Sequence, residues 1–167
     1  MKEIKFEKVS FEQFKKDCEK LGYEGNLEYI YNSIITLPKR GTKGSAGYDF
    51  VCPFNLHLEK GETKTFPTGI RVIIPQDVFL SIYPRSGLGF KTGVSLANSV
   101  GIIDSDYSFS DNEGHIMVKL VGGFEHLYVE KGQNIVQGIF TNYLITSDDN
   151  TETTRNGGFG STDINKK

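Results

Sequence analysis

Short stretches in which apolar and polar residues alternate follow one another along most of the chain after Tyr48, and this pattern predicts β-strands. Turn-forming groups such as Lys60-Gly61-Glu62 separate them. Short, regularly spaced strands without intervening helices are typical of a β-sandwich or jelly roll. The predicted strands are Asn55–Leu58, Thr63–Phe66, Gly69–Ile74, Val78–Tyr83, Val94–Ala97, Ile102–Ile103, His115–Val121, His126–Val129 and Ile135–Leu144.

The N-terminal segment has a different pattern. Lys2–Val9 alternates like a half-buried strand, and Ser10–Gln13 has the form of a capping box, with a serine N-cap and a glutamine three residues later. Apolar residues then recur near helical spacing until Gly22, a natural helix stop. The sequence therefore predicts one short packing helix over about residues 10–21, with the apolar positions Phe11, Phe14, Cys18 and Leu21.

Composition and charge narrow the class of protein. The 167 residues fit one domain with its own core, expected over about residues 1–146, followed by a polar tail at 147–167 that is expected to be mobile. A formal net charge of −2 provides no basic field for a nucleic-acid polymer. No apolar run approaches membrane-spanning length, and the two cysteines form no CxxC pair. We expect a soluble cytoplasmic protein that binds neither nucleic acid nor membrane.

Nineteen glycines gather mainly at residues 41–47, 87–101 and 157–160, where backbone could approach a ligand closely. Within SAGYDF, residues 45–50, Asp49 enters a strand; the alternative is an aspartate that caps a turn. Within PRSGLG, residues 84–89, Arg85 with Ser86 and Gly87 could form a cradle for phosphate oxygens. The alternative there is a strand-to-helix turn with a structural arginine.

The run GVSLANSVGIIDSDY, residues 93–107, is the most informative. Apolar flanks around Asn98 predict a β-hairpin tip, whose backbone donors and acceptors could read the edge of a pyrimidine. Asp104 and Asp106 lie two residues apart, and on an extended chain they would share one face. They could bind a metal or supply a base, or they could be two solvated turn aspartates.

Other polar residues lie inside predicted strands. Gln137 interrupts an apolar strand and needs a partner, either structural or a bound ligand. The three histidines have no metal-ligand spacing, and we interpret His57, His115 and His126 as ordinary strand residues.

Five segments taken together resemble, in order, the five motifs of the trimeric dUTPase family, over roughly residues 37–163. They are SAGYDF, PRSGLG, NSVGIIDSDY, GQNIVQGIF and RNGGFGST. The resemblance implies an all-β, distorted jelly-roll subunit that assembles as a homotrimer with active sites shared between chains. It also implies Mg²⁺-assisted hydrolysis of dUTP to dUMP and pyrophosphate, which limits uracil in DNA and supplies dUMP for dTMP synthesis.

The resemblance assigns roles by position within the motifs. Asp104 would be the general base, Gln137 would hold phosphate and water, and Asp49 would act near the water shell of a magnesium ion held mainly by the substrate phosphates. The substrate-binding residues would be Arg85, Ser86 and Gly87 for phosphate, Asn98, Gly101 and Ile103 for uracil, Tyr107 for deoxyribose, and Arg155, Phe159, Gly160, Ser161 and Thr162 of the tail for uracil and phosphates.

The chain departs from the family pattern in three places. One residue instead of two separates Arg155 from the Gly-Gly pair, a longer acidic loop occupies Ser108–Glu113, and the N-terminal helix is extra. Two alternatives remain at this point. One is a dCTP deaminase, which shares the fold. The other is a fold relative with a regulatory role, whose protein partner would dock on the loop Ser108–Glu113.

Overall fold

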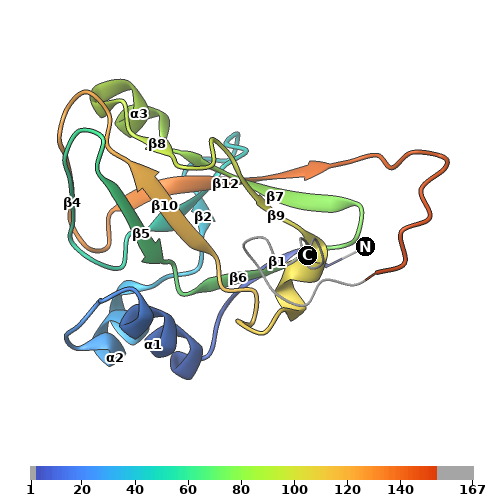
Figure 1. The fold of residues 1–167 in the computed structure, drawn as a ribbon, viewed down its shortest axis with the longest axis horizontal. Helices are drawn as coiled ribbons and strands as arrows, with labels where there is room; N and C mark the ends of the chain where they lie inside the picture. The colour runs from blue at the N-terminus through green and yellow to red at the C-terminus, as the bar shows by residue number, and fades with distance from the viewer. Residues whose placement is uncertain (1–2, 154–167) are drawn as a thin grey trace, which may run out of the picture.

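The computed structural model describes residues 3–153, which fold into four antiparallel sheets. The largest has the order β2-β3-β12-β7-β9, and a three-stranded sheet has the order β5-β10-β8. Two-stranded ribbons, β1-β6 and β11-β4, complete the fold (Figure 1). The strands are β1 Lys5–Lys8, β2 Lys39–Arg40, β3 Tyr48–Val51, β4 Leu56–Leu58, β5 Thr63–Pro67, β6 Ile70–Ile73, β7 Val78–Pro84, β8 Ser95–Leu96, β9 Gly101–Ile103, β10 Met117–Val121, β11 Leu127–Val129 and β12 Asn134–Asn142.

The all-β jelly-roll prediction is confirmed, and every strand that the alternation predicts is present, although often shorter. The alternation also defines the core, because successive side chains in a strand point to opposite faces. Phe50 of β3 and Val136 of β12 lie opposite one another and are both buried. Leu80 of β7 and Leu120 of β10 are buried as well. The sheets therefore enclose one apolar core.

The predicted N-terminal helix is present as α1, Phe11–Lys20, and it buries Phe14 and Cys18 against the sheets. Ser10 is its N-cap and accepts a hydrogen bond from the Gln13 amide nitrogen, as predicted. The second hydrogen bond of a capping box, from the Ser10 N–H to the Gln13 side chain, does not form. The Gln13 side chain binds Asp17 instead, and the Ser10 N–H donates to Glu113, a residue 103 positions away.

Other helical segments were not predicted. A helical turn α2, Leu27–Tyr29, runs into a π-helical turn η1, Ile30–Ile34, and η2, Ser105–Phe109, is a 3₁₀ helix. The helix α3, Ser86–Thr92, is different, because a strand-to-helix turn is one of the two interpretations of PRSGLG. Gly93 ends this helix in the left-handed conformation. In Figure 1, α1 and α2 lie on one side of the sheets and α3 lies at the opposite side.

Two local predictions are wrong. The segment around Asn98 is a tight turn rather than the tip of a hairpin, because β8 and β9 join different sheets and pair with β10 and β7, respectively. His115 is no ordinary strand residue. It precedes β10, is fully buried, and binds the Asp17 carboxylate and the Gly69 N–H.

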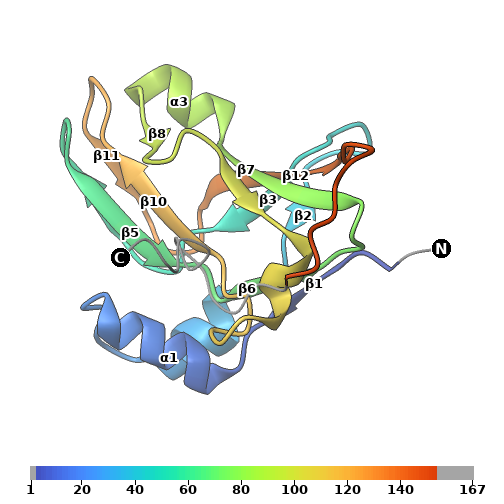
Figure 2. The same cartoon turned by 45° about the vertical axis from the view of Figure 1, so that its right-hand side comes forward.

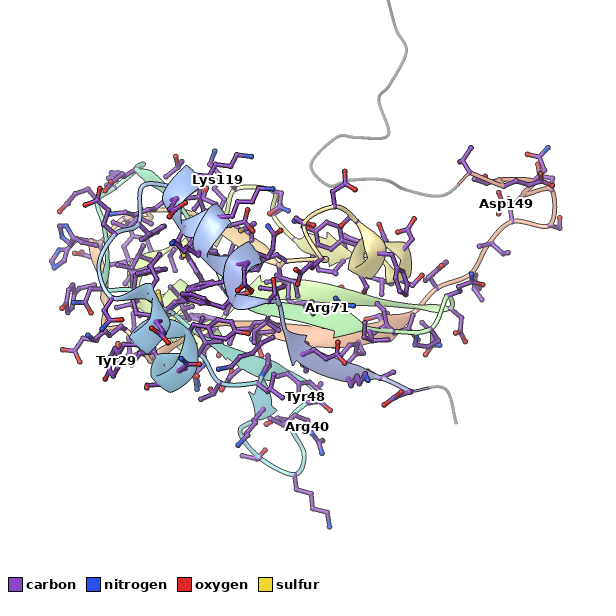
Figure 3. The ribbon with its side chains drawn as sticks, turned by 90° about the horizontal axis from the view of Figure 1, so that it is seen from below. Tyr29, Arg40, Tyr48, Arg71, Lys119 and Asp149 are labelled. Atoms are coloured by element: carbon purple, nitrogen blue, oxygen red, sulfur yellow. The ribbon has the colours of Figure 1, made fainter. Side chains whose placement is uncertain are left out.

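After β12 the described chain continues as an arm, residues 143–153, that leaves the body of the molecule (Figures 1 and 3). Asp149 lies on this arm, far from α1 (Figure 3). Within residues 3–153, no helix is long and apolar enough to cross a membrane.

The close approach of two backbone segments at Gly122 generates a prediction about stability. Gly122 exchanges backbone hydrogen bonds with Gly61 and Glu62, and a Cβ at this position would lie 1.9 Å from the Glu59 carbonyl oxygen. Because a backbone atom cannot rotate away, we expect Gly122→Ala to destabilise the fold by at least about 2 kcal/mol. Urea unfolding measures this free energy. Gly44→Ala is the matched control, since nothing lies within 4 Å of its Cβ, and equal stability of the two variants would contradict the prediction.

Candidate functional site

The middle of the five-stranded sheet carries a row of polar side chains. Asp49 of β3 lies opposite Gln137 of β12, and Gln137 lies opposite Tyr83 of β7. Lys39 of the edge strand β2 lies opposite Asp49. Directly opposed residues in antiparallel strands share a face, so the row lies on the face away from the core side chains Phe50 and Val136.

Asp49 is held in this row by two neighbours. Arg85 Nε lies 3.2 Å from Asp49 Oδ1, and Asn134 Nδ2 donates to Asp49 Oδ2 at 3.3 Å. The Asp49 side chain is 16% exposed and that of Arg85 is 43% exposed. Asp49 therefore does not cap a turn. It forms a half-buried ion pair that joins the SAGYDF and PRSGLG segments, and one side of the arginine remains open to a ligand.

Gln137 lies between the same two segments. Its Nε2 donates to the Pro84 carbonyl at 3.3 Å. Its Oε1 lies so close to Gly47 that a Cβ there would be only 2.3 Å away. Gly47 is therefore needed for the placement of the Gln137 amide rather than for a turn. This role depends on a contact between strands, and the sequence pattern gave no signal for it.

Arg85, Ser86 and Gly87 occupy the junction of β7 and α3. Arg85 is the N-cap of α3 and its side chain provides no capping hydrogen bond. The backbone N–H groups in the first turn of a helix have no acceptor within the helix. The two interpretations of PRSGLG are compatible, because the segment is a strand-to-helix turn and it also places free donors beside Arg85.

The turn around Asn98 is less open than we expected. The Ser99 N–H donates to Leu96 O at 3.0 Å and the Val100 N–H donates to Asn98 O at 2.7 Å, so the turn itself uses these two donors. Ser99 has a left-handed backbone, with φ 63°. The Asn98 side chain is exposed. Gly101 packs closely on Ile82 of β7, its partner in the sheet, where a Cβ would lie 3.1 Å from Ile82 Cβ.

Asp104 and Asp106 do not share a face, and that prediction is wrong. The extended chain stops at Asp104, which is the N-cap position of η2, and Asp106 lies inside this 3₁₀ helix. With three residues per turn, positions two apart point in different directions. Asp104 is half-buried. Asp106 Oδ1 is buried and has no hydrogen-bond partner within residues 3–153.

Tyr107 is buried, with 6% of its surface exposed. Its hydroxyl donates to the His115 carbonyl at 2.8 Å and accepts from Asn112 Nδ2 at 2.8 Å. A ligand could therefore reach only a small part of the ring, and the ring is fixed in its place from the hydroxyl end.

The residues of the candidate site form two separate groups within one chain. Ile103 pairs with Leu80, so Asp104 lies about four residues along β7 from Tyr83, the level of the Asp49 row. The two residues are also three strand spacings apart, in the order β3-β12-β7-β9. With about 3.3 Å per residue and about 4.8 Å between strands, the distance from Asp104 to Asp49 is roughly 19 Å. The remaining predicted residues, Arg155, Phe159, Gly160, Ser161 and Thr162, lie outside the described residues.

Comparisons with known proteins agree on one family. A family model described as dUTPase matches residues 34–163. The deoxyuridine 5'-triphosphate nucleotidohydrolase of Lactococcus lactis subsp. lactis (strain IL1403) is 41% identical over 145 residues, which are 84% of this chain and 96% of that protein. A crystal structure of a dUTPase from Streptococcus mutans aligns with a TM-score of 0.64 and 29% identity, over 86% of this chain and 98% of that chain. A dUTPase mutant from phage phi11 of S. aureus, described as coordinating a structural Mg(II) ion, shares the fold with a TM-score of 0.59 and 18% identity, over 74% and 94% of the two chains.

Proposed function

The chain belongs to the dUTPase family, and we propose how its residues carry out the reaction of that family. It is an enzyme that hydrolyses dUTP to dUMP and pyrophosphate. We propose that water attacks the α-phosphorus and that pyrophosphate leaves, in an active site assembled from several copies of the chain. This chemistry belongs to DNA precursor metabolism, and the proposed location is the cytoplasm.

The observation that carries the proposal is the Asp49–Arg85 ion pair beside Gln137. The exposed side of Arg85 and the N–H groups of Ser86 and Gly87 are suited to phosphate oxygens, since a guanidinium and backbone donors are the usual ligands of phosphate. Asp49 fixes the orientation of the guanidinium. Gln137, placed by Gly47, would hold a phosphate oxygen or the attacking water.

The donor groups near this cluster fit a magnesium ion that is carried by the substrate. Within the described part of the chain, no three His, Cys, Asp or Glu residues are grouped to hold a metal. Mg²⁺ usually keeps several waters and binds through one or two carboxylates together with substrate phosphates. Asp49 is the carboxylate that would contact the water shell. When bound, the ion would offset the charge of the leaving pyrophosphate.

Asp104 is the proposed general base, and its position implies an assembly. A base must lie within about 3 Å of the water that it activates. Asp104 lies roughly 19 Å from Asp49 by strand spacing, so one chain cannot place both at the same α-phosphorus. A homotrimer, in which a neighbouring copy supplies the segment 98–107, would bring Asp104 of one chain close to the phosphate-binding residues of another.

The segment 98–107 is also the proposed reader of the nucleoside. The exposed Asn98 side chain, with the backbone of Gly101 and Ile103, would read the uracil edge, and polar readout discriminates more strongly than apolar packing. The small exposed part of Tyr107 would pack on deoxyribose and exclude a 2′-hydroxyl. Arg155, Phe159, Gly160, Ser161 and Thr162, which lie outside the described residues, are proposed to cover uracil and the phosphates.

A protein partner remains a second proposal, and the structure limits where it would bind. In the loop Ser108–Glu113, the side chains of Ser108 and Ser110 are buried, and those of Asn112 and Glu113 are bound within the chain. Phe109 is 77% exposed and Asp111 is exposed too. A partner would therefore have to recognise these two side chains.

A substrate panel tests the proposed specificity. With magnesium present, we expect kcat/KM for dUTP to exceed the values for dTTP, dCTP and UTP by orders of magnitude, because each of the others fails a different contact. Pyrophosphate release measures turnover. Comparable kcat/KM for dCTP, or release of ammonia from it, would favour the deaminase alternative and contradict the proposal.

A single substitution at Asp104 tests whether this residue is the general base. Asp104→Asn keeps the shape but cannot accept a proton, so we expect kcat to fall by about 10²–10⁴ with little change in KM. Asp106→Asn is the matched control two residues away. If Asp106→Asn is the more damaging change, the base has been assigned to the wrong carboxylate.

Complementation tests the shared site. Arg85→Ala and Asp104→Asn are each expected to be nearly inactive alone. When the two variants are refolded together, some sites will combine Arg85 from one chain with Asp104 from another, and activity should return to a clear fraction of that of the native protein. If every site were built from one chain, no mixture would gain activity, and this result would refute the assembly.

A further inference from the structure

Two features that depart from the family pattern, the N-terminal helix α1 and the longer loop after Tyr107, contact each other. In Figures 1 and 2 the segment that follows η2 runs beside the N-terminal end of α1. We propose that they form one unit, called here the clasp, which positions Tyr107 and thereby sets the discrimination between deoxyribose and ribose. The clasp consists of Ser10, the N-cap of α1, Gln13 and Asp17 on α1, Glu113 at the end of the loop, and His115 just after it. The inference rests on the proposed role of Tyr107 at the sugar.

The first contact joins Glu113 to the start of α1. The Ser10 N–H donates to Glu113 Oε2 at 2.7 Å, and the Ser10 hydroxyl donates to Glu113 Oε1 at 2.6 Å. Glu113 has a left-handed backbone, with φ 59°, which is uncommon for a residue other than glycine. A carboxylate with both oxygens bound to the N-terminus of a helix offsets that conformational cost.

The second contact is buried and joins Asp17 to His115. His115 Nδ1 lies 2.6 Å from Asp17 Oδ2, and Gln13 Nε2 donates to the same oxygen at 2.7 Å. His115 Nε2 accepts from the Gly69 N–H at 2.8 Å. An accepting Nε2 carries no proton, so the neutral ring holds its proton on Nδ1 and donates it to Asp17. All the polar atoms of this ring are satisfied, which fixes its orientation.

Hydrogen bonds lead from the clasp directly to Tyr107. The His115 carbonyl accepts from the Tyr107 hydroxyl, and Asn112 Nδ2 donates to the same hydroxyl. The Ser110 hydroxyl lies 2.6 Å from the Tyr107 carbonyl oxygen and 2.8 Å from Asn112 Oδ1. The Gly114 N–H donates to the same Asn112 oxygen at 3.2 Å, which orients the Asn112 amide. Two successive residues of the loop, Glu113 and Gly114, have positive φ, so this path depends on a defined backbone. The position of α1 therefore determines where the ring of Tyr107 lies.

The two carboxylates of the clasp are stable as anions. Burial raises the pKa of Asp17, but the hydrogen bonds from His115 and Gln13 outweigh it and hold the pKa below its usual value. Burial likewise raises the pKa of Glu113, and the two hydrogen bonds from Ser10 outweigh it. The clasp is therefore fully formed at neutral pH and loses its contribution only in acid, as these carboxylates become protonated.

A rigid ring is required because sugar selection depends on a steric contact. Deoxyribose and ribose differ by one hydroxyl, so a ring that can move away from the sugar would no longer exclude ribose. In this proposal the clasp acts on the sugar only through Tyr107, so its members are positioning residues. A purely structural clasp would affect stability alone, whereas a positioning clasp must change the ratio of kcat/KM for dUTP to kcat/KM for UTP.

The test measures this ratio in variants of the full chain. Asp17→Asn removes the negative charge from the acceptor that His115 and Gln13 share, and Glu113→Gln replaces one of the two carboxylate oxygens in the part-buried contact with Ser10. Couplings through packed contacts are usually worth about 0.5–2 kcal/mol, so the ratio should fall by about 2- to 30-fold in both variants. Glu19→Gln is the matched control on the same helix, since its side chain is 62% exposed and pairs only loosely with Lys15. It should leave the ratio unchanged.

Two comparisons separate failure of the clasp from failure of the proposed function. Tyr107→Ala should lower the ratio, and adding Asp17→Asn to it should lower it no further. A reduced melting temperature with an unchanged ratio in Asp17→Asn and Glu113→Gln would overturn the positioning role. If Tyr107→Ala itself leaves the ratio unchanged, the sugar role of Tyr107 is wrong. In that case the ¹⁹F resonance of fluorotyrosine at position 107 decides, because an unshifted signal in Asp17→Asn would overturn the clasp as well.

Discussion

The pairing of β12 with β3 on one side and β7 on the other is the interaction on which the rest of the site depends. In this pairing, Phe50 and Val136 lie on the face of the sheet that packs into the core. Asp49 and Gln137 lie on the opposite face. A slip of one residue would exchange the two faces and bury the polar row. The hydrophobic core therefore fixes the register, and the register brings together side chains from distant segments of the sequence.

The sequence could predict the strands because alternation is a local signal that the core enforces. A strand-to-helix turn was one interpretation of PRSGLG, but the length of α3 could not be predicted, because Ser86 to Thr92 includes two glycines and has little intrinsic preference for a helix. That helix begins after its N-cap Arg85 and ends at the left-handed Gly93, and its partly buried Leu88 packs against the core. The prediction of a hairpin around Asn98 is wrong for a related reason. Apolar flanks predict two strands, but they do not say that the strands join different sheets.

The candidate site was predictable where residue type alone suggests chemistry, as for Asp49, Arg85 and Gln137. It was not predictable where the role comes from a neighbour across the sheet. Gly47 makes room for Gln137, Asn134 binds Asp49, and Lys39 joins the row only through the β2–β3 register. His115 was interpreted wrongly for the same reason, since its partner Asp17 lies 98 positions away in the sequence.

The strand β9 explains why the segment with Asp104 and Tyr107 needs support from elsewhere in the chain. It has three residues, lies at the edge of the five-stranded sheet, and pairs with β7 alone. An edge strand of this length gives the following residues little restraint. In this protein the restraint comes from buried polar contacts behind them, in which Tyr107 is held by His115 and Asn112, and His115 is held by Asp17 of α1. Such contacts are costly to leave unsatisfied, so they define one arrangement where apolar packing would permit several.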